Sequence, residues 1–197
     1  MDKTPRKMSK PNIGKGDYGF TDFIGTAIAH KSSWQAEACG TIDELNSFIG
    51  ECVARNSNAQ IVSDLTDISK NLFTLGADVA SSMMTEKKLP GITTAHVHHL
   101  EELIIKYEEN LPVIHSFILP LGPISVTALH QARTVCRRTE RLMVRYLVEQ
   151  KTEQKEDATN PLTLAYLNRL SDVLFAMARF VLKENNQPEI YWTRNDA

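Results

Sequence analysis

The stretch from residue 130 to residue 146 constrains the fold more than any other part of this sequence, because it contains neither glycine nor proline. Read as a helix at 100° per residue, it separates into two faces. The apolar face holds Leu129, Ala132, Val135, Cys136, Leu142, Met143, Tyr146 and Leu147. The polar face holds His130, Arg133, Arg137, Glu140 and Arg141. The pattern predicts a long amphipathic helix over about residues 124–150, with its apolar face in the core.

Three arginines of this helix need an explanation, because Arg133, Arg137 and Arg141 follow one another at intervals of four residues. Like charges at this spacing repel each other by about 0.2–0.5 kcal/mol per pair in an isolated helix. Solvent and neighbouring carboxylates such as Glu140 can offset the repulsion. A bound polyanion can do so as well, since the planar guanidinium group suits phosphate oxygens. The helix alone leaves both explanations open.

The composition is that of a soluble globular protein and argues against several function classes. A net charge of −2 over 197 residues does not fit a general nucleic-acid binder. No apolar run approaches the roughly 18 residues of a membrane span, and the basic N-terminus lacks the apolar segment of a secretory signal. Cys39, Cys52 and Cys136 lie far apart and form no CxxC motif, which indicates reduced thiols. We therefore expect a cytoplasmic protein that binds neither nucleic acid nor membranes.

Residues 1–22 predict a basic, mobile segment that ends in a glycine-containing loop. The loop contains Gly16, Asp17, Gly19 and Thr21. The backbone N–H groups of such a loop can approach an anion closely. The loop lacks the GK[ST] ending of a P-loop, so the residues alone favour an ordinary turn over a phosphate site.

Apolar residues recur at intervals of three and four along four further segments, which predicts five helices in total. The expected helices begin near residue 40 and cover about residues 60–82, 93–109, 124–150 and 161–183. Thr41 and Glu44 match a capping box at the start of the first helix, although its periodicity could begin earlier, near Ala36. No segment shows the alternation of a strand. We expect an all-α, antiparallel five-helix bundle over residues 23–185 and a tail over residues 186–197.

Three other features have a structural and a functional interpretation. Asp43 lies near a helix start, where an acidic residue usually complements the helix dipole. His96 and His99 could share a metal ion, but no zinc-enzyme motif surrounds them, so we favour a solvated helix start and expect no metal site. Phe117 lies in a connection broken by prolines, residues 111–123. Apolar residues in such a connection belong to the core or line a pocket for a planar ligand.

Separated blocks of sequence combine into one pattern. The blocks are Gly16-Asp-x-Gly-x-Thr21, Glu37-Ala-x-Gly-Thr-x-Asp-Glu-Leu-Asn46, Asn71-Leu-Phe-x-Leu-Gly-Ala-Asp78, Phe117-Ile-Leu-Pro120, Ala128-Leu-His-x-Ala-Arg-x-Val-Cys-Arg-Arg-x-Glu-Arg141 and Tyr166-Leu-Asn-Arg-Leu-Ser-Asp-x-Leu-Phe175. In this order they resemble the PduO-type ATP:cob(I)alamin adenosyltransferases, also called corrinoid adenosyltransferases. The last two blocks are the most specific, and together the blocks cover most of residues 14–180.

The resemblance implies a five-helix bundle that assembles as a homotrimer, with active sites in clefts between neighbouring subunits. It implies transfer of the 5′-deoxyadenosyl group of ATP to the Co(I) of cob(I)alamin or another reduced corrinoid. Triphosphate leaves, adenosylcobalamin forms, and Mg²⁺ accompanies the ATP. Because Co(I) is itself the nucleophile, the lack of a catalytic triad in the sequence agrees with this chemistry. The resemblance also suggests a partner, either an enzyme that uses adenosylcobalamin or a reductase that supplies Co(I).

The resemblance assigns one set of residues to the nucleotide. These are Gly16, Asp17, Gly19, Thr21, Lys31, Arg137, Glu140 and Asn168. The glycine loop would wrap the triphosphate, and Lys31 would reach the same phosphates. Arg137 and Asn168 would bind ATP, while Glu140 would help to hold the nucleotide and its Mg²⁺.

A second set of residues would act on catalysis itself together with Arg137. Arg133 would pair with Asp43 across the boundary between two subunits. Phe117 would lie against the lower face of the corrin and help to displace the lower axial ligand of cobalt. The resulting four-coordinate Co(II) is easier to reduce.

The sequence departs from the family pattern in three places. Ile13, Gly14 and Lys15 stand where the family has Thr-Arg-Thr or Thr-Lys-Thr, so two hydroxyls that would touch phosphate are missing. Residues 121–123 replace a Gly/Ser-rich turn, and residues 32–33 replace acidic ones. These departures leave open weaker ATP binding, a different corrinoid, or a non-catalytic carrier or sensor on the same fold.

Overall fold

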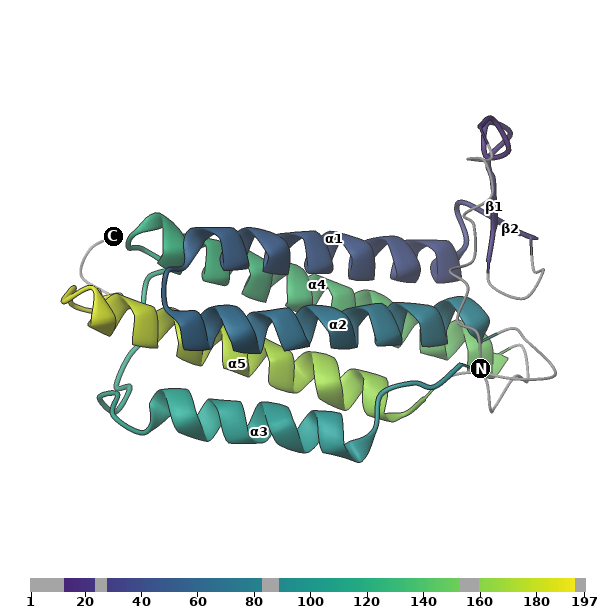
Figure 1. The fold of residues 1–197 in the computed structure, drawn as a ribbon. Helices are drawn as coiled ribbons and strands as arrows, with labels where there is room; N and C mark the ends of the chain where they lie inside the picture. The colour runs from purple at the N-terminus through teal and green to yellow at the C-terminus, as the bar shows by residue number, and fades with distance from the viewer. Residues whose placement is uncertain (1–12, 24–27, 83–88, 153–159, 194–197) are drawn as a thin grey trace, which may run out of the picture.

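The computed structural model describes residues 13–23, 28–82, 89–152 and 160–193 of the chain. Its elements are β1 (Phe20–Asp22), β2 (Ile28–His30), α1 (Trp34–Arg55), α2 (Ala59–Ser81), α3 (Thr94–Glu108), α4 (Ile124–Thr152) and α5 (Leu162–Glu184). Successive helices run in opposite directions along a common axis (Figure 1). This arrangement confirms the all-α, antiparallel five-helix bundle that the sequence predicts.

Helix α4 lies at the centre of the bundle, because it packs against both α1 and α5. Helix α2 packs against α1, and α3 packs against α5. The apolar face expected from the sequence is buried at Leu129, Ala132, Val135, Cys136, Met143 and Tyr146. Leu142 and Leu147 are only half-buried. His130 is buried as well, although the helical pattern placed it among the arginines. The solvent-facing side of α4 is therefore narrower than expected.

The first helix begins earlier than the predicted capping box. Ser33 is the N-cap of α1, and its hydroxyl accepts a hydrogen bond from the backbone N–H of Ala36 at 3.2 Å. Thr41 is buried in the second turn, where its hydroxyl donates to the carbonyl of Glu37 at 2.7 Å. The predicted capping box at Thr41 and Glu44 was therefore wrong. The helix begins upstream, where Ser33 caps its N-terminus.

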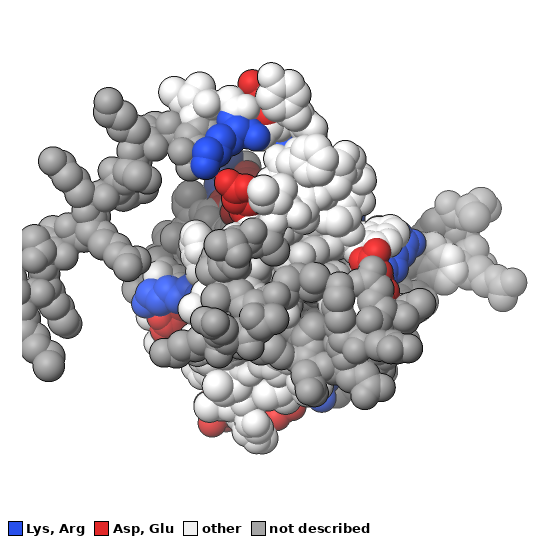
Figure 2. Space-filling view, turned by 90° about the vertical axis from the view of Figure 1, so that its right-hand side faces the viewer, with Lys and Arg blue, Asp and Glu red and all other residues white. Residues whose placement is uncertain are grey.

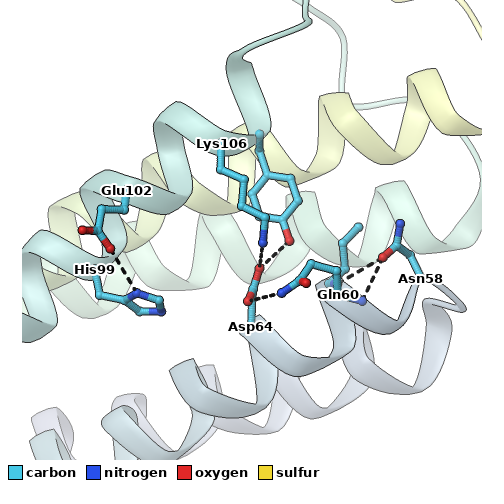
Figure 3. A network of polar contacts seen from close by, with 8 residues as sticks. Asn58, Gln60, Asp64, His99, Glu102 and Lys106 are labelled. Atoms are coloured by element: carbon cyan, nitrogen blue, oxygen red, sulfur yellow. Dashed lines mark hydrogen bonds and ion pairs between the residues drawn. The ribbon is translucent and has the colours of Figure 1, made fainter.

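A polar network on one side of the bundle ties α2 to α3 (Figure 3). Asp64 of α2 accepts hydrogen bonds from Lys106 at 2.7 Å and from Tyr107 at 2.6 Å, both on α3. Gln60 donates to the other carboxylate oxygen of Asp64 at 2.9 Å. Helix α3 packs mainly against α5, and this network links it to α2 as well.

A short antiparallel hairpin precedes the bundle, with Thr21 opposite Ala29. The sequence predicts no strand here, because a strand of three residues is too short to show alternation. The predicted boundary between residues 22 and 23 falls between the two strands. The hairpin projects from the end of the bundle where α1 begins, whereas the connection from α3 to α4 lies at the opposite end (Figure 1).

The end of the bundle shown in Figure 2 carries charged side chains of both signs. Figure 2 shows the end from which the hairpin projects, and there the basic side chains drawn in colour are interspersed with acidic ones. Within the described residues, every helix is too short or too polar to cross a bilayer.

Candidate active site

A cleft of about 380 Å³ brings together Phe117, Arg133 and Arg137, three of the four residues to which the family resemblance assigned catalysis. We call it the Phe117 cleft. It is lined by Ile114, Ser116, Phe117, Ile118, Arg133, Arg137, Ser171, Asp172 and Phe175. The arginines come from α4, the polar and aromatic floor from α5, and Phe117 from the connection between α3 and α4. Phe117 is 80% exposed, so a large apolar ring stands beside two cations.

Arg133 has unused donor capacity at the Phe117 cleft. Its Nε atom is buried without a hydrogen-bond partner among the described residues, and its guanidinium carbon lies 5.7 Å from the ring centroid of Phe175. Burial lowers the pKa of Arg133, and the charge of Arg137 lowers it further. A buried donor without a partner is costly, so this position favours an acceptor brought by a ligand or by another subunit.

The buried His130 lies one turn before Arg133 on α4. Burial lowers the pKa of His130 to about 4, with a smaller contribution from the charge of Arg133. The imidazole is therefore neutral at physiological pH. Its ring stands 6.2 Å from that of Phe175 between centroids, so it packs beneath the cleft rather than adding a further positive charge.

Glu140 and Asn168 extend the polar floor by one helical turn. The side-chain amide of Asn168 donates to Glu140 at 3.3 Å, which joins α4 to α5. Arg169 donates to the amide oxygen of Asn168 at 2.9 Å and to Glu101 of α3 at 3.1 Å. Because Arg137 and Glu140 are three residues apart on one helix, their side chains share a face. Arg137, Glu140 and Asn168 can therefore contact one ligand.

The glycine loop and Lys31 form a second hollow at the hairpin, of about 680 Å³. Lys31 donates to the carbonyl oxygen of Gly16 at 2.7 Å, and Gly19 adopts a φ of +82°, which favours glycine. Lys15 and Thr21 line the same hollow. The hairpin thus places two ammonium groups beside a glycine-rich backbone, an arrangement that suits phosphate oxygens.

Asp43 lies apart from both of these hollows. It lines a groove of about 290 Å³ between α1 and α2, together with Asn46, Phe73 and Gly76. The side-chain oxygen of Asn46 is buried and has no hydrogen-bond partner among the described residues. Phe73 is 69% exposed in this α1–α2 groove. One chain alone therefore does not bring Asp43 to Arg133.

The site residue that sequence reasoning missed is Phe175. Its ring contacts Arg133, lines the Phe117 cleft and packs near His130. The signal was present, because Phe175 follows Ser171 by four residues on α5 and so shares its face.

In the described part of the chain, no group of three His, Cys, Asp or Glu side chains is arranged to hold a metal ion. His96 instead accepts the N–H of Thr93 at the start of α3, at 3.0 Å.

Comparison with known proteins places this chain in a family. The family model for cobalamin adenosyltransferase matches residues 12–181. The chain belongs to the cobalamin adenosyltransferase family. It is 38% identical to the corrinoid adenosyltransferase of Bacillus subtilis over 91% of this chain and 90% of that protein. It is 35% identical to the human corrinoid adenosyltransferase MMAB over 98% of this chain and 77% of that protein.

Solved structures of the same family have the same fold. A variant PduO-type ATP:corrinoid adenosyltransferase from Lactobacillus reuteri, complexed with cobalamin and ATP, matches with a TM-score of 0.82 and 32% identity. The match covers 95% of this chain and all of that one. Another variant from the same organism, complexed with ATP, matches with a TM-score of 0.79 and 34% identity over 91% of this chain and 98% of that one. The resemblance seen in the sequence blocks is thereby confirmed.

Proposed function

We propose that this chain transfers the 5′-deoxyadenosyl group of ATP to the cobalt of a reduced corrinoid. The observation that carries the proposal is the Phe117 cleft, where an exposed aromatic ring stands beside Arg133 and Arg137. A planar apolar ligand and a polyphosphate can meet at such a place. The family's relatives, named corrinoid adenosyltransferases, support the same activity.

The reaction needs little acid–base chemistry from the chain. The electron pair of Co(I) forms the bond to C5′ of ATP, the C5′–O bond breaks, and triphosphate leaves with the electron pair of the broken bond. The work left to the protein is to position C5′ over cobalt and to stabilise the charge on the departing triphosphate. Arg137 and Lys31 are suited to the second task, and Phe117 to the first.

Asn168 and Glu140 fit a nucleotide accompanied by Mg²⁺. Mg²⁺ prefers oxygen ligands and is usually bound through one or two carboxylates together with substrate phosphates. Glu140 offers one such carboxylate, oriented by the amide of Asn168 at 3.3 Å. When bound, Mg²⁺ would neutralise part of the triphosphate charge.

We further propose that the working molecule is a homotrimer in which sites form between subunits. Three features support this. The hairpin and the Phe117 connection lie at opposite ends of one bundle. Arg133 Nε and Asn46 Oδ1 are buried without partners among the described residues. The α1–α2 groove exposes the aromatic ring of Phe73 beside Asp43.

A non-catalytic carrier or sensor is the alternative that the departure at residues 13–15 raised. Lys15 lines the hairpin hollow together with Lys31, and it lies 3.9 Å from Asp22. A second ammonium group can replace the electrostatic part of the missing hydroxyls. This observation favours an active transferase.

An anaerobic assay tests the function. The protein is mixed with chemically reduced cob(I)alamin, ATP and Mg²⁺, and the Co(I) absorbance is followed. We expect loss of that absorbance, dependent on both protein and ATP, with appearance of the adenosylcobalamin spectrum. Bound corrinoid without conversion would instead support the carrier or sensor and would direct attention to residues 13–15 and 121–123.

A further inference from the structure

The connection that carries Phe117 has no secondary structure of its own to fix it. It contains prolines at positions 112, 120 and 123. In the described part of the chain, the hydrogen bonds made by the backbone of residues 112–118 go to the C-terminal residues and to one side chain, Arg179. The position of Phe117 therefore depends on groups far away in the sequence.

The C-terminal residues 189–192, which we call the C-terminal clasp, run antiparallel to this connection. The N–H of Trp192 donates to the carbonyl of Phe117 at 2.7 Å. The N–H of Leu119 donates to the carbonyl of Ile190 at 2.8 Å. Further contacts between the two segments are the antiparallel bridge of Ile118 with Tyr191 and the hydrogen bond from Ser116 Oγ to the carbonyl of Trp192 at 3.0 Å. The backbone on both sides of Phe117 is thus fixed by one short extended segment.

Arg179 anchors the clasp and the connection at the same time. It lies on α5 and is 4% exposed. Its Nε donates to Glu189 at 2.6 Å, and one of its terminal nitrogens donates to the carbonyl of Pro112 at 2.6 Å. The second carboxylate oxygen of Glu189 accepts the hydroxyl of Tyr191 at 2.6 Å. Charge-assisted bonds of this kind are the strong ones, and removing either charge leaves its partner buried and unpaired.

The anchor is continuous with the Phe117 cleft. The guanidinium carbon of Arg179 lies 6.0 Å from the ring centroid of Phe175, and that of Arg133 lies 5.7 Å from the same ring. Phe175 forms part of the cleft floor. The aromatic ring therefore separates a cation that faces the cleft from a cation that fixes the structure behind it.

We propose that Arg179 and the C-terminal clasp position Phe117 for the corrinoid, so that Arg179 and Glu189 act on the reaction without touching substrate. The proposal rests on the proposed adenosyl transfer. Phe117 is 80% exposed, so packing of its own ring does not fix it and the backbone must. A displacement of about 1 Å in a positioning group can cost roughly 100-fold in rate. Nucleotide binding, which uses other residues, does not depend on the clasp.

The test compares substitutions that break the clasp with matched ones that do not. Glu189→Gln removes the charge that pairs with Arg179. Trp192→Pro removes the N–H that bonds to Phe117, and Trp192→Ala keeps this N–H while removing the same indole. Lys183→Met is the control on α5, because Lys183 donates at 2.6 Å to the carbonyl of Asn110, outside the clasp. All variants are first checked for a native melting profile and for ATP affinity by calorimetry.

We expect Glu189→Gln to lower kcat/KM for the corrinoid about 10- to 100-fold while the Kd for ATP stays unchanged. Trp192→Pro should be several-fold worse than Trp192→Ala, and Lys183→Met should resemble the unaltered chain. Arg179→Lys keeps the positive charge but cannot donate to Glu189 and to Pro112 with two separate nitrogens. Its kcat/KM should fall between those of Glu189→Gln and the unaltered chain. Unchanged corrinoid kinetics in a folded Glu189→Gln protein would overturn the proposal, as would a parallel loss of ATP affinity.

Hydrogen exchange separates this proposal from the proposed function. The amide of Leu119 should be protected in the unaltered chain, because it donates to Ile190. In Glu189→Gln it should exchange at least tenfold faster, while core amides of α4 keep their protection. This result would stand even if the unaltered chain failed to adenosylate corrinoids. Equal protection of Leu119 in both proteins would refute the clasp itself.

Discussion

At the scale of single residues, two adjacent arginines of α4 have different surroundings. Arg137 lines the Phe117 cleft, whereas Arg138 is half-exposed and pairs with Glu44 of α1. They carry the same charge on the same helix turn. The pair therefore separates a contribution to ligand binding from the general effect of removing a surface arginine.

We predict that Arg137→Ala lowers kcat/KM about 10- to 150-fold, because each lost charge-assisted contact is worth about 1.5–3 kcal/mol. Arg138→Ala, which breaks an exposed ion pair, should change activity less than about twofold and stability by less than 1 kcal/mol. Steady-state kinetics with ATP and cob(I)alamin measure both. Similar losses in the two variants would remove Arg137 from the site.

The sequence predicts the burial of a side chain correctly where a helical pattern decides it. It does not predict which neighbouring helix covers that side chain. The apolar face predicted for α4 includes residues that are buried in the core, such as Cys136 and Met143. His130 was misplaced because a helical wheel shows the angle around one helix and not the neighbour, here Phe175 of α5, that covers it. The family resemblance paired Asp43 with Arg133 across a subunit boundary, and the structure places the two residues in different hollows of one chain.

At the scale of elements, the link between α2 and α3 through Asp64 depends on pH (Figure 3). Burial raises the pKa of Asp64, but hydrogen bonds from Lys106, Tyr107 and Gln60 outweigh that effect and leave the pKa below its usual range. A carboxylate whose pKa is lowered by folding stabilises the fold fully above its unfolded pKa, about 3.9. That contribution is lost as the pH falls through the lowered pKa of the folded state.

We predict that Asp64→Asn lowers the free energy of unfolding at pH 7 by about 1.5–3 kcal/mol, since Asp64 accepts from a cation and from a buried hydroxyl. Asp67→Asn is the matched control on α2, because its ion pair with Lys70 is exposed and worth less than about 1 kcal/mol. Urea unfolding at pH 7, 5 and 3 measures both. The difference between Asp64→Asn and the unaltered chain should persist at pH 5 and shrink at pH 3; a constant difference would contradict the assigned pKa direction.

Element boundaries show why the sequence predicts some structures and not others. Helices α2, α3 and α4 were predicted within about two residues, because their apolar periodicity is long and proline or polar caps mark the ends. The hairpin of β1 and β2 was missed, since three-residue strands carry no periodic signal. The pairing of Ile118 with Tyr191 was out of reach, because it joins two irregular segments far apart along the chain. From the sequence, residues 186–197 were expected only to form a tail.

At the scale of the whole molecule, the hollows that contain the expected site residues are spread over different parts of one bundle. The hairpin hollow and the connection that carries Phe117 lie at opposite ends of the bundle. The α1–α2 groove with Asp43 and the Phe117 cleft with Arg133 are lined by different helices. Five helices and their periodicity could be derived from the residues, whereas the trimer is an expectation that rests on family resemblance. A surface that contacts another subunit is not marked in the sequence by a regular spacing of residues.

We predict that inactive Asp43→Ala and Arg133→Ala chains restore activity when they assemble together. If each site takes Asp43 from one subunit and Arg133 from the next, a site regains both residues wherever an Asp43→Ala chain lends its arginine to an Arg133→Ala chain. In randomly mixed trimers this describes about one quarter of the sites. Co-expression with two different tags, tandem purification of the mixed species and the anaerobic assay measure the gain.

The same experiment has an internal control, because a chain that carries both substitutions can be mixed with either single variant. In such a mixture every chain lacks the same residue, either Asp43 or Arg133, so no site can contain both. The mixture should therefore stay inactive. Recovery in the first mixture alone requires that the two residues come from different chains. If both mixtures stayed inactive although the trimers form, Asp43 and Arg133 would have to act within one chain, and the α1–α2 groove would need another occupant.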